Sequence, residues 1–404
     1  MSKSPARATG IRDIRLSDTG RYDLAFDDEG MISSVTPASE GMPRNGDIDG
    51  RGLLAIPGIV NAHAHIDKSW WGLPWQSYGG EGGTDGRIRH ERARRDELGI
   101  PSTAITRSVL AELVRHGTTA IRSHVDVDLG LGLRGLEVVR EALAEYGDSL
   151  RAELVAFPQD GVLRRPGVLE LLDQAAREGL AEHVGGLDPA GIDRDPVGQL
   201  DGLFTIAADR GVGIDIHLHD HAELGAFQFD LILDRTEALG LAGRVNIAHG
   251  FAIAQVDAVR RHDLLQRMAA LDVTFTTVAP LRLPQLPLHE LDAAGVRFAF
   301  GTDGIRDLWS PYGTGDTLGI AWQYARSSSL VRDEDLARVV DIATSGAGSF
   351  AGLADHAIAE GSRADVVLID AENVMDALVR TPRRELVVGA GRVLFDAERP
   401  EPVL

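Results

Sequence analysis

Short apolar segments alternate with helical patterns through the middle of the 404-residue chain. The apolar segments predict buried strands, and stretches such as residues 136–146, 168–178 and 200–210 have the spacing of amphipathic helices. This alternation is typical of βα units that build a parallel sheet. Eight such units predict an α/β fold, a (β/α)8 TIM barrel. The predicted strands end near His65, Asp126, Gln159, Asp188, His219, His249, Ala279 and Asp303.

Polar side chains stand at all but one of these predicted strand ends. The C-terminal strand ends form the active face of a TIM barrel. The sequence therefore predicts a functional site at that face.

The two ends of the chain have a different pattern. Short alternating segments such as residues 22–26 and 391–395 predict small strands joined by turns. We expect residues 1–56 and 359–404 to pair into one small β-sandwich beside a metal-dependent barrel formed by residues 57–358.

Charge and composition exclude several classes of protein. The formal net charge of −20 argues against nucleic acid or an anionic membrane as the main partner. Cysteine is absent, so the chain has neither disulfides nor thiolate ligands. The first nine residues are polar, and no apolar run approaches the ~18 residues of a membrane span. We expect a cytoplasmic protein that acts on a small molecule.

Two histidines close the first predicted strand with one residue between them. His63 and His65 therefore point to the same face, and neutral imidazoles suit zinc or iron. His217 and Asp303, at the ends of the fifth and eighth strands, can converge with them. The fourth strand, residues 183–189, has no lysine that could be carboxylated to bridge a second ion. We predict one divalent metal per chain, with zinc preferred and iron as the alternative, held by His63, His65, His217 and Asp303.

Lysine is almost absent from this arginine-rich chain. Only Lys3 and Lys68 are lysines among the 41 basic residues. Codon bias explains the general preference for arginine. Lys68 nevertheless follows His65 by three residues, which suggests a task that a planar guanidinium cannot perform. We predict that Lys68 binds or polarises the substrate and does not bind the metal.

These motifs together resemble the amidohydrolase superfamily and, within it, the cytosine deaminase branch. The superfamily resemblance is carried by residues 57–65, His217, residues 247–250 and residues 301–303. The branch resemblance is carried by residues 123–127, 155–159 and 307–313, and residues 65–69, 185–190, 217–220 and 305–309 are similar to triazine-degrading members.

The resemblance implies roles for individual residues. Asp303 would take a proton from metal-activated water, and His249 would steady the attacking oxygen or the tetrahedral intermediate. Either Asp220 or His219 would protonate the departing nitrogen. Substrate contacts are expected from Lys68, Gln159, Trp309 and the position of Gly304. The family also suggests a homo-oligomer.

Two positions depart from the cytosine deaminase pattern. Asp220 stands where that branch has Glu, and Gly304 stands where it has a second Asp that contacts the pyrimidine. The triazine hydrolase shares Asp220 but has Asn at position 304. Cytosine itself is therefore disfavoured as the substrate.

The sequence thus predicts a hydrolase that cleaves a non-peptide C–N bond of a small cyclic amide, amidine or N-substituted amino-heterocycle. The alternative is a deaminase that releases ammonia from a pyrimidine-like base. A non-catalytic scaffold is disfavoured because every expected ligand is present.

Some aromatic and histidine side chains keep two interpretations. Trp70, Trp71 and Trp75 lie in an insertion at residues 69–102, where they either anchor the loop or cover the substrate. The roles of His124 and His221 stay open. The other histidines are predicted to be solvated surface residues: His90, His116, His183, His262, His289 and His356.

Overall fold

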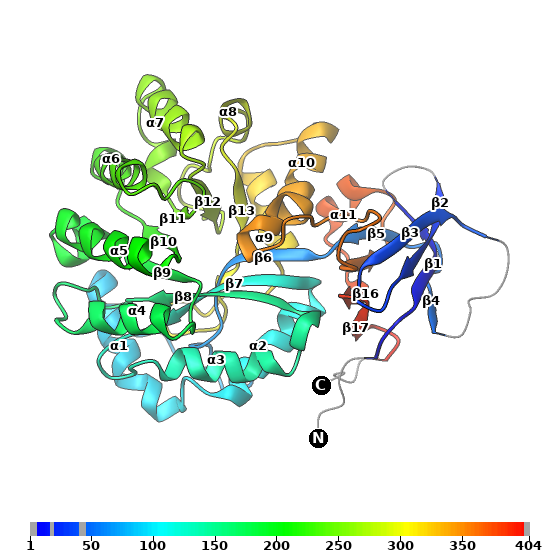
Figure 1. The fold of residues 1–404 in the computed structure, drawn as a ribbon, viewed down its shortest axis with the longest axis horizontal. Helices are drawn as coiled ribbons and strands as arrows, with labels where there is room; N and C mark the ends of the chain where they lie inside the picture. Colours follow the sequence, from blue (N-terminus) through cyan, green and yellow to red (C-terminus); the bar gives the residue numbers. More distant parts are fainter. Residues whose placement is uncertain (1–5, 17–19, 40–45, 400–404) are drawn as a thin grey trace.

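A curled parallel sheet of nine strands forms the centre of the protein (Figure 1). The computed structural model describes residues 6–16, 20–39 and 46–399. The strand order of the sheet is β13-β12-β11-β10-β9-β8-β7-β6-β14, and every neighbouring pair is parallel. The strands are β6 (Ile59–His65), β7 (Thr118–Asp126), β8 (Arg151–Phe157), β9 (His183–Leu187), β10 (Gly213–Leu218), β11 (Val245–His249), β12 (Thr274–Thr277), β13 (Phe298–Phe300) and β14 (Asp303–Gly304).

The last predicted strand is split into two pieces. Residues 301–302 separate β13 from β14, and β14 pairs with β6 so that Asp303 lies opposite Ala64. A Cβ on Gly301 would stand 2.3 Å from the carbonyl oxygen of His63. Glycine is therefore required where the chain presses against β6, and this contact interrupts the strand predicted to run through 296–302.

Helices cover the outer side of the curled sheet (Figure 1). In α4, for example, Val168, Leu172, Ala175 and Ala176 are buried, which is one face of a helix. The helices around the sheet are α2 (Thr103–Arg115), α3 (Arg134–Ala144), α4 (Val168–Arg177), α5 (Pro196–Arg210), α6 (Ala222–Ala238), α7 (Ala258–Ala270), α8 (Leu288–Ala294), α9 (Thr317–Ser327) and α10 (Asp333–Ala343).

The insertion after β6 contains a helix that the sequence analysis did not predict. Helix α1 (Gly83–Leu98) is rich in charge on all sides, so it lacks an apolar period. Its inward face is itself charged. Arg95 on that face is buried and forms a two-pronged ion pair with Asp128 at 2.5 and 3.0 Å.

The two chain ends meet in a second sheet, as the similar patterns predicted. Its order is β17-β16-β15-β5-β1-β2-β3, with β4 beside β1, and strands from both ends lie side by side (Figure 1). The described strands form a single sheet, so a second layer is not seen. They are β1 (Gly10–Arg15), β2 (Arg21–Phe26), β3 (Ile32–Pro37), β4 (Asp47–Asp49), β5 (Leu54–Pro57), β15 (Val366–Ile369), β16 (Arg384–Gly389) and β17 (Arg392–Asp396), with α11 (Val374–Arg380) between β15 and β16.

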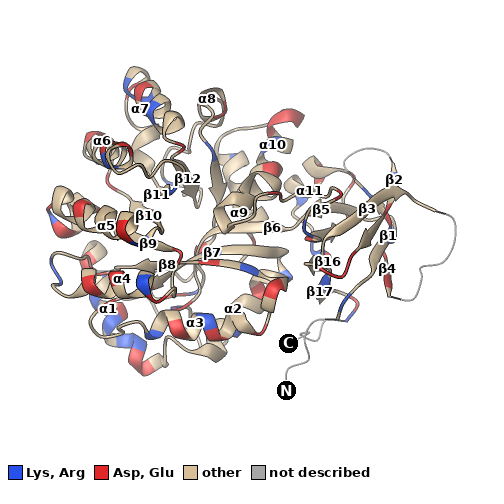
Figure 2. Ribbon diagram, viewed as in Figure 1, with Lys and Arg blue, Asp and Glu red and all other residues tan. Residues whose placement is uncertain are grey.

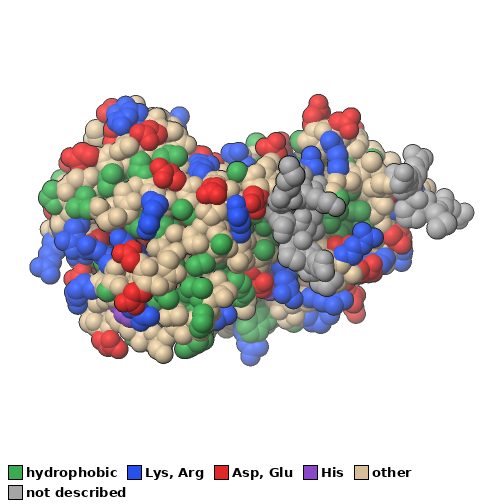
Figure 3. All heavy atoms as spheres, turned by 90° about the horizontal axis from the view of Figure 1, so that it is seen from below, with side chains coloured by type: hydrophobic (Ala, Val, Ile, Leu, Met, Phe, Trp, Pro, Cys, Tyr) green, Lys and Arg blue, Asp and Glu red, His purple; other side chains and the backbone are tan. Residues whose placement is uncertain are grey.

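Acidic and basic side chains are interspersed over the helices (Figure 2). The face seen in Figure 3 likewise carries both signs of charge without a single-sign field, despite the acidic total. No helix in the described part of the chain combines the length and apolar character needed to cross a bilayer.

Candidate metal centre and substrate cavity

A cavity of about 650 Å³ lies where the parallel strands end, and it is lined by residues that those strands carry. This volume is in the usual range for a small-molecule site. Most of the predicted site residues line it, and His63 and Asp220 do not. The lining includes His65, Lys68, Thr84, Arg87, Phe157, Gln159, Leu187, His217, His219, His249, Asp303, Gly304, Asp307, Trp309 and Tyr312.

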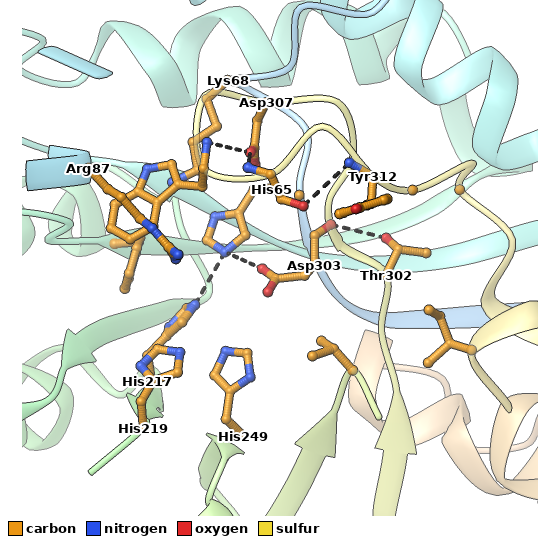
Figure 4. A pocket seen from close by; sticks show the side chains of 18 of the residues that line it. His65, Lys68, Arg87, His217, His219, His249, Thr302, Asp303, Asp307 and Tyr312 are labelled. Carbon is orange, nitrogen blue, oxygen red and sulfur yellow. Dashed lines mark hydrogen bonds and ion pairs between the residues drawn. The ribbon is translucent and has the colours of Figure 1, made fainter. Parts of the chain in front are cut away.

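Three of the predicted metal ligands, His65, His217 and Asp303, lie close together in the cavity wall (Figure 4), and His63 approaches Asp303 from outside the lining. The Oδ1 atom of Asp303 lies 3.3 Å from Nε2 of His65 and 3.6 Å from Nε2 of His63. Nε2 of His65 lies 3.2 Å from Nε2 of His217. Ligands that bind one ion tetrahedrally at 2.0–2.1 Å stand about 3.3 Å apart. These three pairs therefore have the spacing of ligands around a single small divalent ion.

Two imidazoles of this group, those of His65 and His217, also have the right protonation state. Burial, followed by the charge of Lys68, lowers the pKa of His65 to about 3. Burial and the neighbouring imidazoles hold the pKa of His217 well below its usual range. Both nitrogens of His63 are buried without a hydrogen-bond partner within the described chain. Neutral, unpartnered imidazoles are the form that binds divalent metals, so the site fits such an ion.

Two further histidines border the four converging side chains. His124, which the sequence left open, is fully buried, with its ring 4.4 Å from that of His63 and 4.5 Å from that of His217. His63, His124 and His217 hold their ligand atoms within 4.8 Å of one another, and so do His63, His249 and Asp303. Of the two additional histidines, only His249 reaches the cavity wall.

The backbone is held in an uncommon conformation at two of these positions. His249 has a φ of 68° and Asp303 a φ of 60°, both in the left-handed region. Residues other than glycine adopt this region at a cost of about 1–3 kcal/mol. The surrounding sheet therefore sustains local strain at these two cavity-lining side chains.

His219 and Asp220, the two candidate proton donors, have different surroundings. His219 lines the cavity, stacks on His249 at 4.2 Å, and donates from Nδ1 to Asp188 at 2.9 Å. Its Nε2 atom is thus free to meet a ligand. Burial lowers the pKa of His219, but the Asp188 carboxylate outweighs it and raises the pKa overall. Asp220 lies outside the lining and accepts a hydrogen bond from Gln228 at 2.9 Å.

Lys68 and its partners form one wall of the cavity. Lys68 is 5% exposed, and its Nζ donates to Asp126 at 3.0 Å and to Oε1 of Gln159 at 2.5 Å. Its Nζ also stands 5.6 Å from the ring centre of Phe157 and 5.7 Å from that of Trp309. The buried carboxylates around Lys68 raise its pKa against the effect of burial, so it keeps its charge. One ammonium proton and the Gln159 amide group stay available to a ligand.

The three tryptophans of the insertion do not line the cavity. Trp70 is fully buried and donates from Nε1 to the carbonyl of Asp307 at 3.0 Å, whereas Trp75 is 64% exposed. The guanidinium of Arg306 lies 4.2 Å from the ring of Trp70 and 5.3 Å from that of Trp71. Trp70 and Trp71 thus anchor the insertion to the loop at 305–310.

Sequence reasoning missed α1, which adds Thr84 and Arg87 to the lining because of its position alone.

The prediction of solvated histidines is wrong at two positions. His356 is buried and donates from Nε2 to the carbonyl of Gly58 at 2.7 Å. His183 begins β9 and lies 2.8 Å from Glu153 with its side chain only 12% exposed. Neither partner is near in the sequence, so the local pattern carried no sign of these contacts. His262 and His289 are exposed, as predicted, whereas His90 and His116 are half-buried.

Comparison with known proteins confirms the class of enzyme that the fold and the site indicate. Residues 47–395 match the sequence model of the amidohydrolase family, and the chain belongs to this family. It is therefore an enzyme that hydrolyses carbon–nitrogen bonds other than peptide bonds, and its family is metal-dependent.

Particular relatives share almost the whole chain. The crystal structure of N-isopropylammelide isopropylaminohydrolase from Burkholderia multivorans is 38% identical, covers 95% of this chain and 97% of its own, and has a TM-score of 0.90. N-isopropylammelide isopropyl amidohydrolase from Pseudomonas sp. is 28% identical over 96% of this chain and 97% of its own. A structure of 5-methylcytosine deaminase from Klebsiella pneumoniae is 25% identical with a TM-score of 0.84, covering 96% of this chain and 97% of its own.

Proposed function

We propose that this protein is a mononuclear metal-dependent hydrolase that cleaves a non-peptide C–N bond of a small cyclic amide, amidine or N-substituted amino-heterocycle. One observation carries the proposal. Three pairs among the ligand atoms of His63, His65, His217 and Asp303 are 3.2–3.6 Å apart, which is the spacing of ligands around one tetrahedral ion. Zinc is the preferred metal, and iron is the alternative, because imidazole and carboxylate ligands suit both.

Asp303 and His249 are assigned to the attacking water. His63, His65, His217 and Asp303 would hold the divalent ion, which would supply an acidified water at neutral pH when bound. Asp303 has a second carboxylate oxygen beyond the one near the histidines, and its side chain is 41% exposed to the cavity. That oxygen accepts the proton of the attacking water. His249, at the end of β11, donates or accepts a hydrogen bond at the oxygen that develops charge.

His219 is assigned to the departing nitrogen. Its Nδ1 is hydrogen-bonded to Asp188, which fixes the ring and leaves Nε2 for the substrate. Proton delivery to the leaving amine is the task of a general acid. The position of Asp220 outside the lining supports His219 over Asp220 in this role.

Ring recognition is assigned to the wall that contains Lys68. Lys68 and Gln159 offer N–H donors to a ring carbonyl or ring nitrogen. Trp309 supplies a flat apolar surface, and its indole N–H is held by Glu91 on α1. The similarity to N-isopropylammelide hydrolases supports a substrate that carries an alkylamino group.

The alternative is a deaminase that releases ammonia from a pyrimidine-like base. The similarity to 5-methylcytosine deaminase at 25% identity favours it, and the two activities would share the same metal, water and ring contacts. Only the leaving group differs. Gly304, which lacks the carboxylate of the cytosine deaminase pattern, disfavours cytosine itself.

We extend the proposal to the architecture and assembly. The curled sheet is assigned to a (β/α)8 barrel whose last strand is divided into β13 and β14, since β14 closes against β6. Residues 1–56 and 359–404 are assigned to one smaller unit, whose described strands share a sheet and for which the sandwich stays a prediction, and residues 57–358 to the barrel. A homo-oligomer stays a prediction that light scattering of the purified protein tests.

A substrate screen tests the function. Zinc-loaded and iron-loaded protein is incubated with alkylamino-triazines, amino-pyrimidines, cyclic ureas and N-substituted amides, and alkylamine and ammonia are measured separately. Release of an alkylamine from a heterocycle supports the proposed hydrolase, and release of ammonia alone supports the deaminase. Absence of either product with metal-loaded, folded protein would contradict both.

A further inference from the structure

Asp307 lies on the same cavity wall as Lys68, beyond the residues to which the proposed function assigns a task (Figure 4). It is 7% exposed. Its Oδ1 atom accepts two backbone hydrogen bonds, from Trp309 at 2.8 Å and from Ser310 at 2.7 Å. No hydrogen bond to its Oδ2 atom is formed within the described chain, so one carboxylate oxygen stays available to a ligand.

Gly304 leaves the space that this free oxygen occupies. A Cβ atom at position 304 would lie 1.7 Å from Oδ2 of Asp307, and both residues line the cavity. A side chain at 304 and the present position of the Asp307 carboxylate therefore exclude each other. The Oδ2 atom of Asp307 therefore occupies the place at which a side chain at 304 would begin.

The loop that carries Asp307 is firmly held. Trp70 donates its indole N–H to the carbonyl of Asp307, and Ser69 donates its hydroxyl to the carbonyl of Ile305 at 2.7 Å. Together with the two backbone bonds to Oδ1, these contacts fix the direction of Oδ2. An acceptor that is held in place before the ligand arrives loses little entropy on binding.

We propose that Asp307, exposed to the cavity by Gly304, is a specificity-determining residue that accepts a hydrogen bond from a ring N–H of the substrate. This inference rests on the proposed function for the position of the ring. Beside it, Lys68 and Gln159 supply donors, so the wall presents donors next to an acceptor. A heterocycle with an adjacent carbonyl and N–H, as in a cyclic amide or urea, matches this order.

The protonation of Asp307 agrees with an acceptor role. Burial raises the pKa of Asp307 to about 6, and the positive charge of Lys68 limits the rise. At pH 7.5 the carboxylate is thus mainly ionised and accepts hydrogen bonds at both oxygens.

The substitution Asp307→Asn isolates the free oxygen. Its amide oxygen can keep the two backbone bonds at the Oδ1 position, and its NH₂ group then replaces an acceptor by a donor at the Oδ2 position. Binding of uracil and of 1,3-dimethyluracil, which has no N–H, is measured by calorimetry on the zinc-loaded full chain at pH 7.5. Because binding is measured, the result does not depend on turnover.

We expect Asp307→Asn to weaken uracil binding about tenfold to a hundredfold, the range for a hydrogen bond to a charged group, and to change dimethyluracil binding less than twofold. Gly304→Ala, which displaces the carboxylate, should show the same selective loss. Asp209→Asn, at an exposed aspartate outside the cavity lining, is the matched control and should leave both affinities unchanged.

Equal weakening of both probes, or no weakening of uracil, would overturn the role of Asp307, as would a wild-type protein that binds neither probe. Zinc content and melting temperature of each variant show whether it is folded. If uracil binding is lost selectively in the variants but the wild-type protein releases no amine from any compound in the substrate screen, the role of Asp307 stands. The proposed reaction is then refuted.

Discussion

At the scale of single residues, Lys68 combines a structural and a chemical task. It is buried against Asp126 and Gln159, yet it reaches the cavity. Removing its charge leaves Asp126 buried without a counter-charge, and broken buried pairs of this kind cost about 3–5 kcal/mol. We expect Lys68→Met to lose that stability and most of kcat/KM while keeping its metal.

The double variant Lys68→Met/Asp126→Asn separates the two tasks. It removes both charges, so its free energy of unfolding should recover most of the loss, while kcat/KM stays low. Lys68→Arg keeps the charge but not the compact shape, and it should also retain metal and lose kcat/KM. Near-normal kinetics of Lys68→Arg on the substrate found by the screen would return this lysine to a purely structural role.

The neighbouring residues His219 and Asp220 provide a second residue-scale prediction. We expect His219→Gln to lower kcat by about 10²–10⁴, the usual contribution of a general acid, because its Nε2 faces the cavity. Asp220→Asn should lower kcat less than tenfold, since the side chain is bonded to Gln228 outside the lining. The two variants are compared by steady-state kinetics at matched zinc content. A larger loss of kcat in Asp220→Asn than in His219→Gln would assign the role of proton donor to Asp220.

At the scale of elements, the insertion supports the loop that recognises the substrate. Trp70 is packed against Ile100 and Leu308 and is hydrogen-bonded to the backbone of Asp307. Trp70→Phe should leave that carbonyl unsatisfied, lower stability by about 1–3 kcal/mol and reduce kcat/KM about tenfold through misplacement of the loop. The exposed Trp75→Phe is the control and should change stability by no more than about 0.5 kcal/mol. If both variants behave alike in thermal unfolding and kinetics, the anchoring role is wrong.

At the scale of the whole molecule, the metal should connect stability to activity. An ion that binds only the folded chain adds about 2.7 kcal/mol of stability when it is present at a hundred times its dissociation constant. Chelation of the zinc-loaded protein should therefore lower its melting temperature, and added zinc should restore it.

The variant His63→Ala is the matched test of that connection. It should hold little metal, show no activity, and have a melting temperature that a chelator does not change. Elemental analysis of the wild-type protein should give one equivalent of metal per chain. Two equivalents, or a His63→Ala protein that still responds to chelator, would contradict a single site built on this residue.

The local pattern of the chain determined much of the scaffold and the polar residues at its strand ends. A strand has a period of two, so the positions of His63 and His65 on one face followed from the sequence alone. The alternation of strands and helices likewise predicted the parallel sheet, and the similar short strand patterns at the two chain ends predicted that these ends meet. These properties depend on neighbours in the chain, which a sequence displays directly.

Only the tertiary structure determined the orientation of the side chains in the loops that follow the strands. Asp188, from a different strand, directs His219 to the cavity, and Gln228 holds Asp220 away from it. The same is true of Gly304, which leaves room for Asp307, and of the charged helix α1, whose inward face pairs with distant residues. These orientations are set by contacts between residues far apart in the chain, and no local period encodes such contacts.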